Sequence, residues 1–184
     1  LLDAMLTQCD LTGADLTSAT MERAALDRCT FTEARLTGAR LKQAKLYGGS
    51  CARADFTGAA VTTAVIAECD LAGASLAGLV FERTVLSKPV LQGARLDGSV
   101  LRQAVWMGAD FSGASLAGVR FEHGIFHDCV FAGVDLAGAD LARSQFMGCD
   151  LVNANLERAT LVQCNFRGAN LGLANLKRAD ARNA

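Results

Sequence analysis

Residues 109–118 read ADFSGASLAG, and this decapeptide contains two copies of the pattern that decides the fold. Phe111 and Leu116 are the large apolar centres of the two copies. A small residue lies two positions before each centre, and a Gly lies two positions after it. The same spacing of five runs through the chain without an insertion or deletion. Of 37 centres, 35 are Leu, Phe, Met, Val, Ile or Trp, with Cys51 and Ala181 as the exceptions.

A repeat of five residues fits neither a continuous helix nor a straight strand. A helix would rotate successive centres by about 140° and form no apolar face. A straight strand would send alternate centres to opposite faces. The chain must therefore bend once per repeat, with the centre and the small residue pointing inward and the residue between them pointing outward. Gly at the second bend position, found in 15 repeats, favours a type II turn with positive φ. Arg, Gln or Glu there predicts a type I-like turn.

Residue spacing also predicts how many repeats complete one coil. Five of the six Cys at the small position are separated by multiples of 20 residues: Cys9, Cys29, Cys69, Cys129 and Cys149. Among the centres, Trp106 is followed at intervals of 20 residues by Phe126, Phe146 and Phe166. Four repeats per coil, stacked about 4.8 Å apart, make a four-sided parallel β-helix of about nine coils.

Segments such as Ala14–Ser18, Ala109–Gly113 and Ala169–Leu173 resemble the repeats of the pentapeptide-repeat proteins, and the resemblance covers the whole chain. It implies an all-β, right-handed quadrilateral parallel β-helix, with the handedness that spacing alone does not supply. The family prefers Asp or Asn before the centre, but only 13 of 36 such positions comply. We expect a single domain over residues 1–184. We also expect it to be excised from a longer chain, because it begins with Leu and ends without a change of pattern.

The charge pattern argues against several classes of function. Eighteen Lys and Arg face nineteen Asp and Glu without a charge block, so we expect no nucleic-acid or membrane partner. The densest basic stretch is spread around the coil with Tyr47 as its one outward aromatic residue: Arg35, Arg40, Lys42, Lys45 and Arg53. Opposite charges at 20-residue spacing predict ion-pair ladders along two columns, which are Asp15, Arg35 and Asp55, and Glu82, Arg102 and Glu122.

The outward positions carry one well-defined apolar feature, on two neighbouring faces of the predicted coil. On one face lie Val65, Val85, Val105 and Ile125, together with Met107 and Met147, each of which directly follows a centre. On the next face lie Val80 and Val100. One interpretation is a ladder of β-branched residues that only stabilises the strands. The other is a contact surface for a protein partner, because contiguous exposed apolar area usually marks such a surface.

We expect no catalytic site, metal site or cofactor. All seven Cys fall on inward positions, which favours reduced, buried thiols in the cytoplasm. Cys pairs one coil apart are near enough for a disulfide, but their parallel Cβ directions make its geometry poor. His123 and His127, with Glu122, Asp128 and Cys129 nearby, resemble a metal or acid/base cluster. These residues fall on different sides of the coil, so a solvated surface is favoured over a metal or acid/base site.

These observations predict a non-enzymatic protein-interaction scaffold. The resemblance extends this to a domain of a bacterial secretion-system accessory or effector protein. The alternative that it implies is a DNA-mimicking protein that binds gyrase or another topoisomerase. The net charge of −1 and the Arg residues at outward positions count against that alternative.

One proline and the two ends of the chain predict departures from a regular, isolated rod. Pro89 takes a small inward position, and Leu79 and Thr84 replace Ala at the two such positions before it. This predicts a bend or a widened side between residues 79 and 90. Uncapped terminal coils predict end-to-end self-association.

Overall fold

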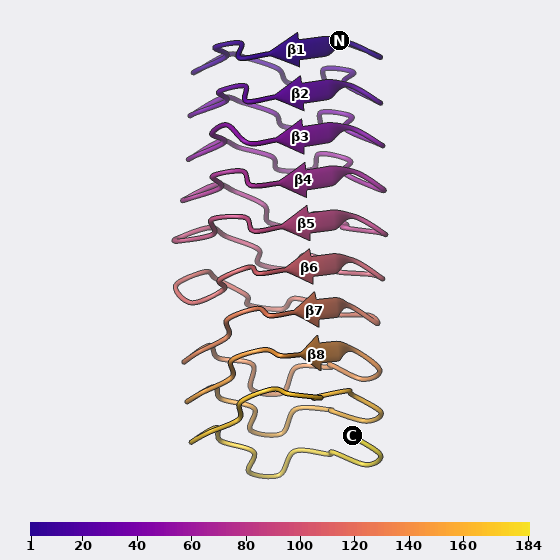
Figure 1. Ribbon diagram of the computed structural model, residues 1–184, viewed down its shortest axis with the longest axis vertical. Coiled ribbons are helices and arrows are strands. Elements are labelled where there is room, and N and C mark those ends of the chain that lie inside the picture. The colour runs from indigo at the N-terminus through magenta and orange to yellow at the C-terminus, as the bar shows by residue number, and fades with distance from the viewer.

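The computed structural model describes residues 1–184, which form strands and turns and no helix. Successive 20-residue coils stack into a rod, and one strand per coil lies on the same side (Figure 1). The strands form one parallel sheet in sequence order: β1 Met5–Thr7, β2 Ala25–Asp27, β3 Lys45–Tyr47, β4 Val65–Ala67, β5 Val85–Ser87, β6 Val105–Met107, β7 Ile125–His127 and β8 Gln145–Met147. Seven turns separate β1 from β8, and a bridge from Gln145 to Asn165 extends this side by one more coil.

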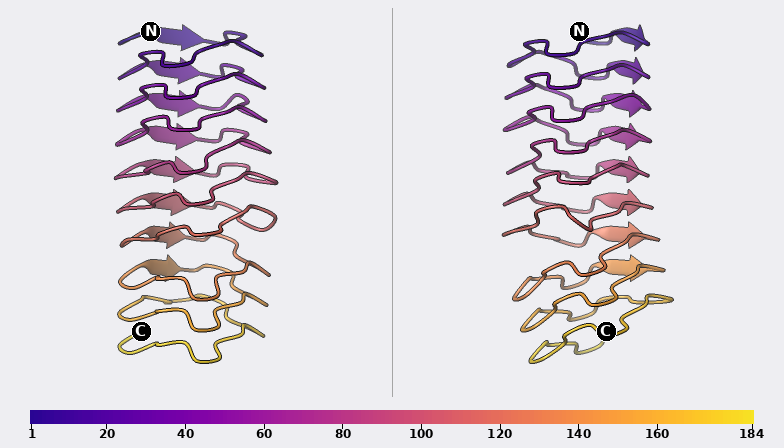
Figure 2. Two further views of the ribbon diagram at one scale, coloured as in Figure 1. Left: turned by 180° about the vertical axis from the view of Figure 1, so that it is seen from behind. Right: turned by 90° about the vertical axis from the view of Figure 1, so that its left-hand side faces the viewer.

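The register of the sheet confirms the predicted coil length. Met5 pairs with Ala25, and every later strand keeps the 20-residue offset. The other three sides of the coil carry isolated parallel bridges with the same offset, such as Thr30 with Ser50. Figure 2 shows that the regular strands occupy one side of the rod only. This side, formed by β1 to β8, is called the strand face below.

The turn prediction is wrong for repeats that lack Gly. The second bend residue has positive φ in every repeat, including Arg53 at 56° as well as Gly38 at 66°. Inter-coil hydrogen bonding explains this, because the Arg53 N–H donates to the Ala72 carbonyl at 2.8 Å and the Gly38 N–H donates to the Thr57 carbonyl at 2.9 Å. The ladder therefore holds non-Gly residues in the left-handed region, at a cost of about 1–2 kcal/mol each.

The centres and the small residues fill the interior as predicted, in one cluster of 50 buried apolar residues. Aromatic rings from successive coils stack in the C-terminal half. The ring centroids of Phe126 and Phe146 are 5.0 Å apart, and those of Phe146 and Phe166 are 5.4 Å apart. These distances follow the spacing of the coils, because each ring comes from the same position in its coil.

The seven cysteines are free, and all except half-buried Cys9 are buried. Their thiols contact backbone carbonyls, with the Cys164 Sγ 2.8 Å from the Leu141 oxygen and the Cys69 Sγ 3.1 Å from the Gly48 oxygen. Burial raises the pKa of Cys69 to about 12 and that of Cys164 to about 11. These cysteines are therefore small packing residues that also act as weak hydrogen-bond donors.

Pro89 itself fits its corner, but the coil is loosened toward the next turn, where the N–H groups of Leu91 and Asp110 donate to no backbone acceptor. A cavity of about 470 Å³ lies there, lined in part by Pro89 and Leu91. The residues on both sides of Pro89 donate inter-coil bonds, from Lys88 N–H to the Met107 carbonyl at 2.7 Å and from Val90 N–H to the Cys69 carbonyl at 3.1 Å. The N–H of the equivalent Cys69 is used in no backbone bond either. Proline is tolerated because this corner does not need the missing donor.

Three bridges are missing from otherwise continuous columns, and each lies beside a bulky residue at the small inward position. The missing pairs are Ala60 with Val80, Ser115 with Asp135, and Arg120 with Asp140. The adjacent inward residues are Leu79, Val134 and Val119, the only Leu and Val at this position in the chain. Extra volume inside the coil thus separates adjacent turns. The widening predicted for residues 79–90 is present in part, at Val80 and beside Pro89, and a larger widening lies at residues 113–142.

Candidate functional site

The strand face carries the predicted apolar strip. Val65, Val85, Val105 and Ile125 pair in register along β4 to β7. These four side chains are half-buried, because each lies against its neighbours in the ladder. Met107, on the same face, is 38% exposed, and Met147 is half-buried. The strand-face strip is defined here as these six residues.

The neighbouring face supplies less apolar surface than predicted. Val80 is 41% exposed, but Val100 is only 4% exposed. Val100 has a paired neighbour on each side in its bridge column, Val80 and Arg120, whereas Val80 is paired on one side only. Val100 is therefore removed from the candidate contact residues.

One exposed apolar residue, Val90, was missed as a contact residue, whereas Tyr47 lies in the predicted column of Met107 and Met147. Val90 is 50% exposed on the side that follows the strand face, and Tyr47 is exposed at the end of β3. The signal for Val90 was present in the sequence, because Val90 and Val130 occupy the same outward column at 40-residue separation.

The charged columns form only some of the predicted ion pairs. Arg35 lies 3.6 Å from Asp15, and Arg102 lies 2.7 Å from Glu122. The other predicted partner of Arg35, Asp55, instead accepts hydrogen bonds from two Thr hydroxyls, Thr57 at 2.5 Å and Thr37 at 3.1 Å. The Thr57 bonds, with smaller contributions from Thr37 and Arg35, lower the pKa of the Asp55 carboxyl.

The histidines are not brought together with a set of ligands. His127 Nδ1 lies 2.7 Å from the Asp128 carboxylate, while Cys129 is buried and His123 lies on another side of the coil. No group of three or more His, Cys, Asp or Glu side chains is arranged to hold a metal ion.

The second candidate site is an open seam, defined as the gap between residues 113–123 and residues 132–142. One turn earlier, the same two sides of the coil are closed. Six backbone hydrogen bonds of 2.8–3.1 Å join residues 94–103 to residues 115–122, for example from the Leu96 N–H to the Ser115 carbonyl and from the Arg120 N–H to the Ser99 carbonyl. None of the six equivalent bonds forms across the seam. Figure 1 shows the corners of successive turns farther apart at the coral turns between β6 and β8 than in the indigo and magenta turns.

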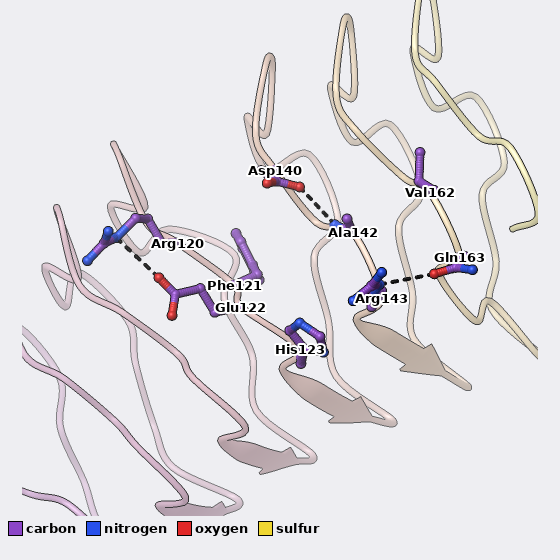
Figure 3. Close-up of a pocket in the computed structure, with 9 residues that line it drawn as sticks. All are labelled: Arg120, Phe121, Glu122, His123, Asp140, Ala142, Arg143, Val162 and Gln163. Atoms are coloured by element: carbon purple, nitrogen blue, oxygen red, sulfur yellow. Dashed lines mark hydrogen bonds and ion pairs between the residues drawn. The ribbon is translucent and has the colours of Figure 1, made fainter.

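Three adjoining cavities of about 320, 300 and 410 Å³ follow the seam along its length. The last of them is drawn in Figure 3, where Arg120, Glu122 and His123 lie on one rim and Asp140 and Arg143 on the other. Core residues are slightly uncovered here, with Leu116 8%, Val119 6% and Val134 7% exposed. The seam thus has a polar rim and an apolar floor.

Sequence comparison agrees with this architecture. Residues 3–33, 34–61, 64–103 and 90–128 match the family described as pentapeptide repeats, and residues 119–184 match the pentapeptide repeat region family. The chain belongs to the pentapeptide-repeat family. A search of curated proteins found no match. The structure contains no helix that would cross a membrane.

Several solved pentapeptide-repeat proteins are similar to this one. HetL from the cyanobacterium Nostoc sp. strain PCC 7120, involved in the regulation of heterocyst differentiation, is 28% identical with a TM-score of 0.59. The similarity covers 96% of this chain and 86% of HetL. Rfr23 from Cyanothece 51142 is 22% identical over 64% of this chain and 87% of its own, with a TM-score of 0.38. QnrB1, a plasmid-mediated fluoroquinolone resistance protein, is 18% identical over 98% and 85%, with a TM-score of 0.40.

Proposed function

We propose that this pentapeptide-repeat protein is a non-enzymatic scaffold that binds a protein partner through the strand-face strip. One observation carries the proposal: apolar residues from four successive strands lie in register on the one side of the rod that forms a continuous sheet. Lys45 and Gln145 lie at the two ends of the Val and Ile column. An apolar centre with polar ends is the arrangement typical of protein interfaces.

Two further observations support this proposal. HetL is involved in regulation, a kind of role that is compatible with a binding module. The seven free thiols favour a reducing compartment, so we place the scaffold in the cytoplasm. The context of a bacterial secretion system stays a prediction. A DNA-mimicking role is disfavoured because Arg35 and Arg95 interrupt a column of Asp and Ser residues.

The test separates the strip from the scaffold. In a triple variant, Val85, Val105 and Ile125 are each replaced by Thr, which retains β-branching while removing apolar contact area. Photo-crosslinking from Met107, replaced by a photoreactive methionine analogue, identifies a partner in cells of the source organism. Calorimetry with the purified partner then measures affinity.

We expect the triple variant to bind the partner at least about tenfold more weakly, because central desolvated residues dominate interface energies. A matched control replaces Val90 and Val130 by Thr on the adjacent side, and its affinity should change less than about twofold. Equal affinity of both variants would show that the Val ladder is only part of the scaffold.

A further inference from the structure

We propose that the open seam is a slot for an extended segment of a partner polypeptide, which inserts between the two rims as an additional strand. This site is independent of the strand-face strip, because the seam follows the columns of Ser115 and Arg120, whereas the strip follows β4 to β7. The two sites can therefore be tested separately.

Both rims of the seam carry a row of unpaired backbone groups. On one rim, Leu116, Gly118, Phe121 and His123 have N–H groups that donate to no backbone or side-chain acceptor. On the other rim, the N–H groups of Asp135 and Asp140 are likewise unpaired. Such rows are the edges that an added strand completes. One inserted strand would satisfy both rims, because its own N–H and C=O groups point alternately to the two sides.

The charged side chains do not offer a competing site for an ion. Arg120 Nε lies 3.6 Å from Glu122, and Arg143 donates to Gln163 at 3.0 Å. Asp140 accepts a hydrogen bond from the backbone N–H of Ala142 at 3.0 Å. These groups are engaged with near neighbours in Figure 3. The groups left free are those of the main chain, so the ligand chemistry that fits is another main chain.

The floor of the seam defines which side chains the segment carries. Inward-facing residues of the inserted strand meet Leu116, Val119 and Val134, which are nearly buried. The volume there is limited, so small residues such as Ala, Gly or Ser are required at every second position. About five residues cover one side of the coil, at about 3.3 Å per residue, so a segment that follows both sides of the seam has about ten residues and bends once at the corner. The outward residues of the segment face solvent and are unrestricted.

Val119 and Val134 also explain why the rims do not close on each other. In the coils whose inward positions are occupied by Ala, the corresponding rims are fully bonded. The two Val side chains keep the turns apart, and the backbone groups between them remain accessible. Replacing both Val by Ala should therefore let the rims pair and remove the slot.

The experiment uses a capped peptide of the sequence Thr-Ala-Thr-Ala-Thr-Ala-Thr as the probe. Its titration into the ¹⁵N-labelled protein is followed by amide chemical shifts. We expect saturable shifts confined to residues 113–123 and 132–142, and at least tenfold weaker binding to the Val119→Ala/Val134→Ala variant. The same peptide with alternate amides N-methylated is the control, and it should not bind the unmodified protein.

Three results would overturn the proposal. They are the absence of saturable shifts at the seam, equal binding of the N-methylated peptide, and seam shifts that change with protein concentration alone, which would identify a second copy as the occupant. The N-methylated control keeps the test valid if the double variant does not fold. Loss of peptide binding with partner binding retained at the strand-face strip would separate the two sites.

Discussion

Residues 34–43 and residues 114–123 occupy the same two sides of the coil, yet only the first stretch is bonded to the turn that follows it. Ala34 and Ala39 are the inward small residues of the first stretch, and the facing turn also has Ala at both positions. All six inter-coil bonds form there, at 2.7–3.1 Å. In the second stretch and its facing turn, Val119 and Val134 replace two of the four Ala, and none of the six bonds forms.

The open side is the one at which both facing turns carry a Val. Each Val is bonded normally on its other side, where the Arg120 N–H donates to the Ser99 carbonyl and the Asn155 N–H donates to the Val134 carbonyl, both at 2.9 Å. The centres on both sides are large and apolar, and the bend residues have positive φ in both stretches. Overfilling a packed interior costs about 1–3 kcal/mol. A hydrogen bond contributes only about 0.5–1.5 kcal/mol net when water can replace it. Opening this side relieves the overfilling, and the freed N–H and C=O groups can bond to water instead. Leu79 alone removes one bridge, which is a smaller version of the same effect.

The largest expected effect is the loss of stability when a Leu centre is truncated, compared between a closed coil and the seam. Leu96→Ala, in a closed coil with the side chain 0% exposed, should lower the free energy of unfolding by about 2–5 kcal/mol. Leu116→Ala at the seam should cost less, because water can enter the space that it leaves. Urea unfolding measures both variants. Equal losses would mean that the seam is packed as tightly as the rest of the rod.

A second prediction exchanges the inward residues. Ala39→Val places the bulk of Val119 in a closed coil, and should destabilise the protein by about 1–3 kcal/mol through overpacking. It should also increase hydrogen exchange at the amides of Leu36 and Leu41, which bond to the next turn at 2.7 and 2.8 Å. Ala39→Ser, which adds less volume, is the control. If hydrogen exchange at these amides is unchanged in the Ala39→Val variant, the volume of the inward residue is not the cause of the opening.

A third prediction uses pH to examine the closed coils. Burial raises the pKa of Cys69 to about 12 and of Cys164 to about 11, whereas an unfolded thiol ionises near 8.5. The folded protein therefore holds these protons more tightly. The stability that they contribute is complete below about pH 8.5 and decreases as the pH rises toward the folded pKa.

For Cys164, the loss between pH 8 and pH 10 should be about 1–2 kcal/mol. Urea unfolding of the Cys164→Ala variant at both pH values should show a correspondingly weaker pH dependence than the unmodified protein. A parallel pH dependence in the two proteins would mean that water reaches this thiol in the folded state.

Much of the fold follows from residue spacing, because one large inward residue in five, with its small partner two positions earlier, defines the bend and the core. Cys and Phe at 20-residue intervals give the coil length. The positive φ of residues such as Arg53 does not follow from local preference, since it is imposed by the bond to the next coil. Pro89 is similar, because only the structure shows that its corner needs no N–H donor.

The candidate sites were less predictable. The strand-face strip was found by sorting outward residues into columns, but the burial of Val100 depends on its neighbours Val80 and Arg120. The seam was not predicted, because Val119 and Val134 occupy the small inward position and differ from Ala there by only two methyl groups. The difference between Ala and Val matters only once the space between adjacent coils is known.

The most direct test of the account is native-state hydrogen exchange of the unmodified protein, resolved by residue. The amides of Leu96, Gly98 and Leu101 should be protected, because each donates to the next turn at 2.8–2.9 Å. The equivalent amides of Leu116, Gly118 and Phe121 should exchange many times faster, because they face the seam without a partner. Equal, strong protection of the two sets would contradict the open seam.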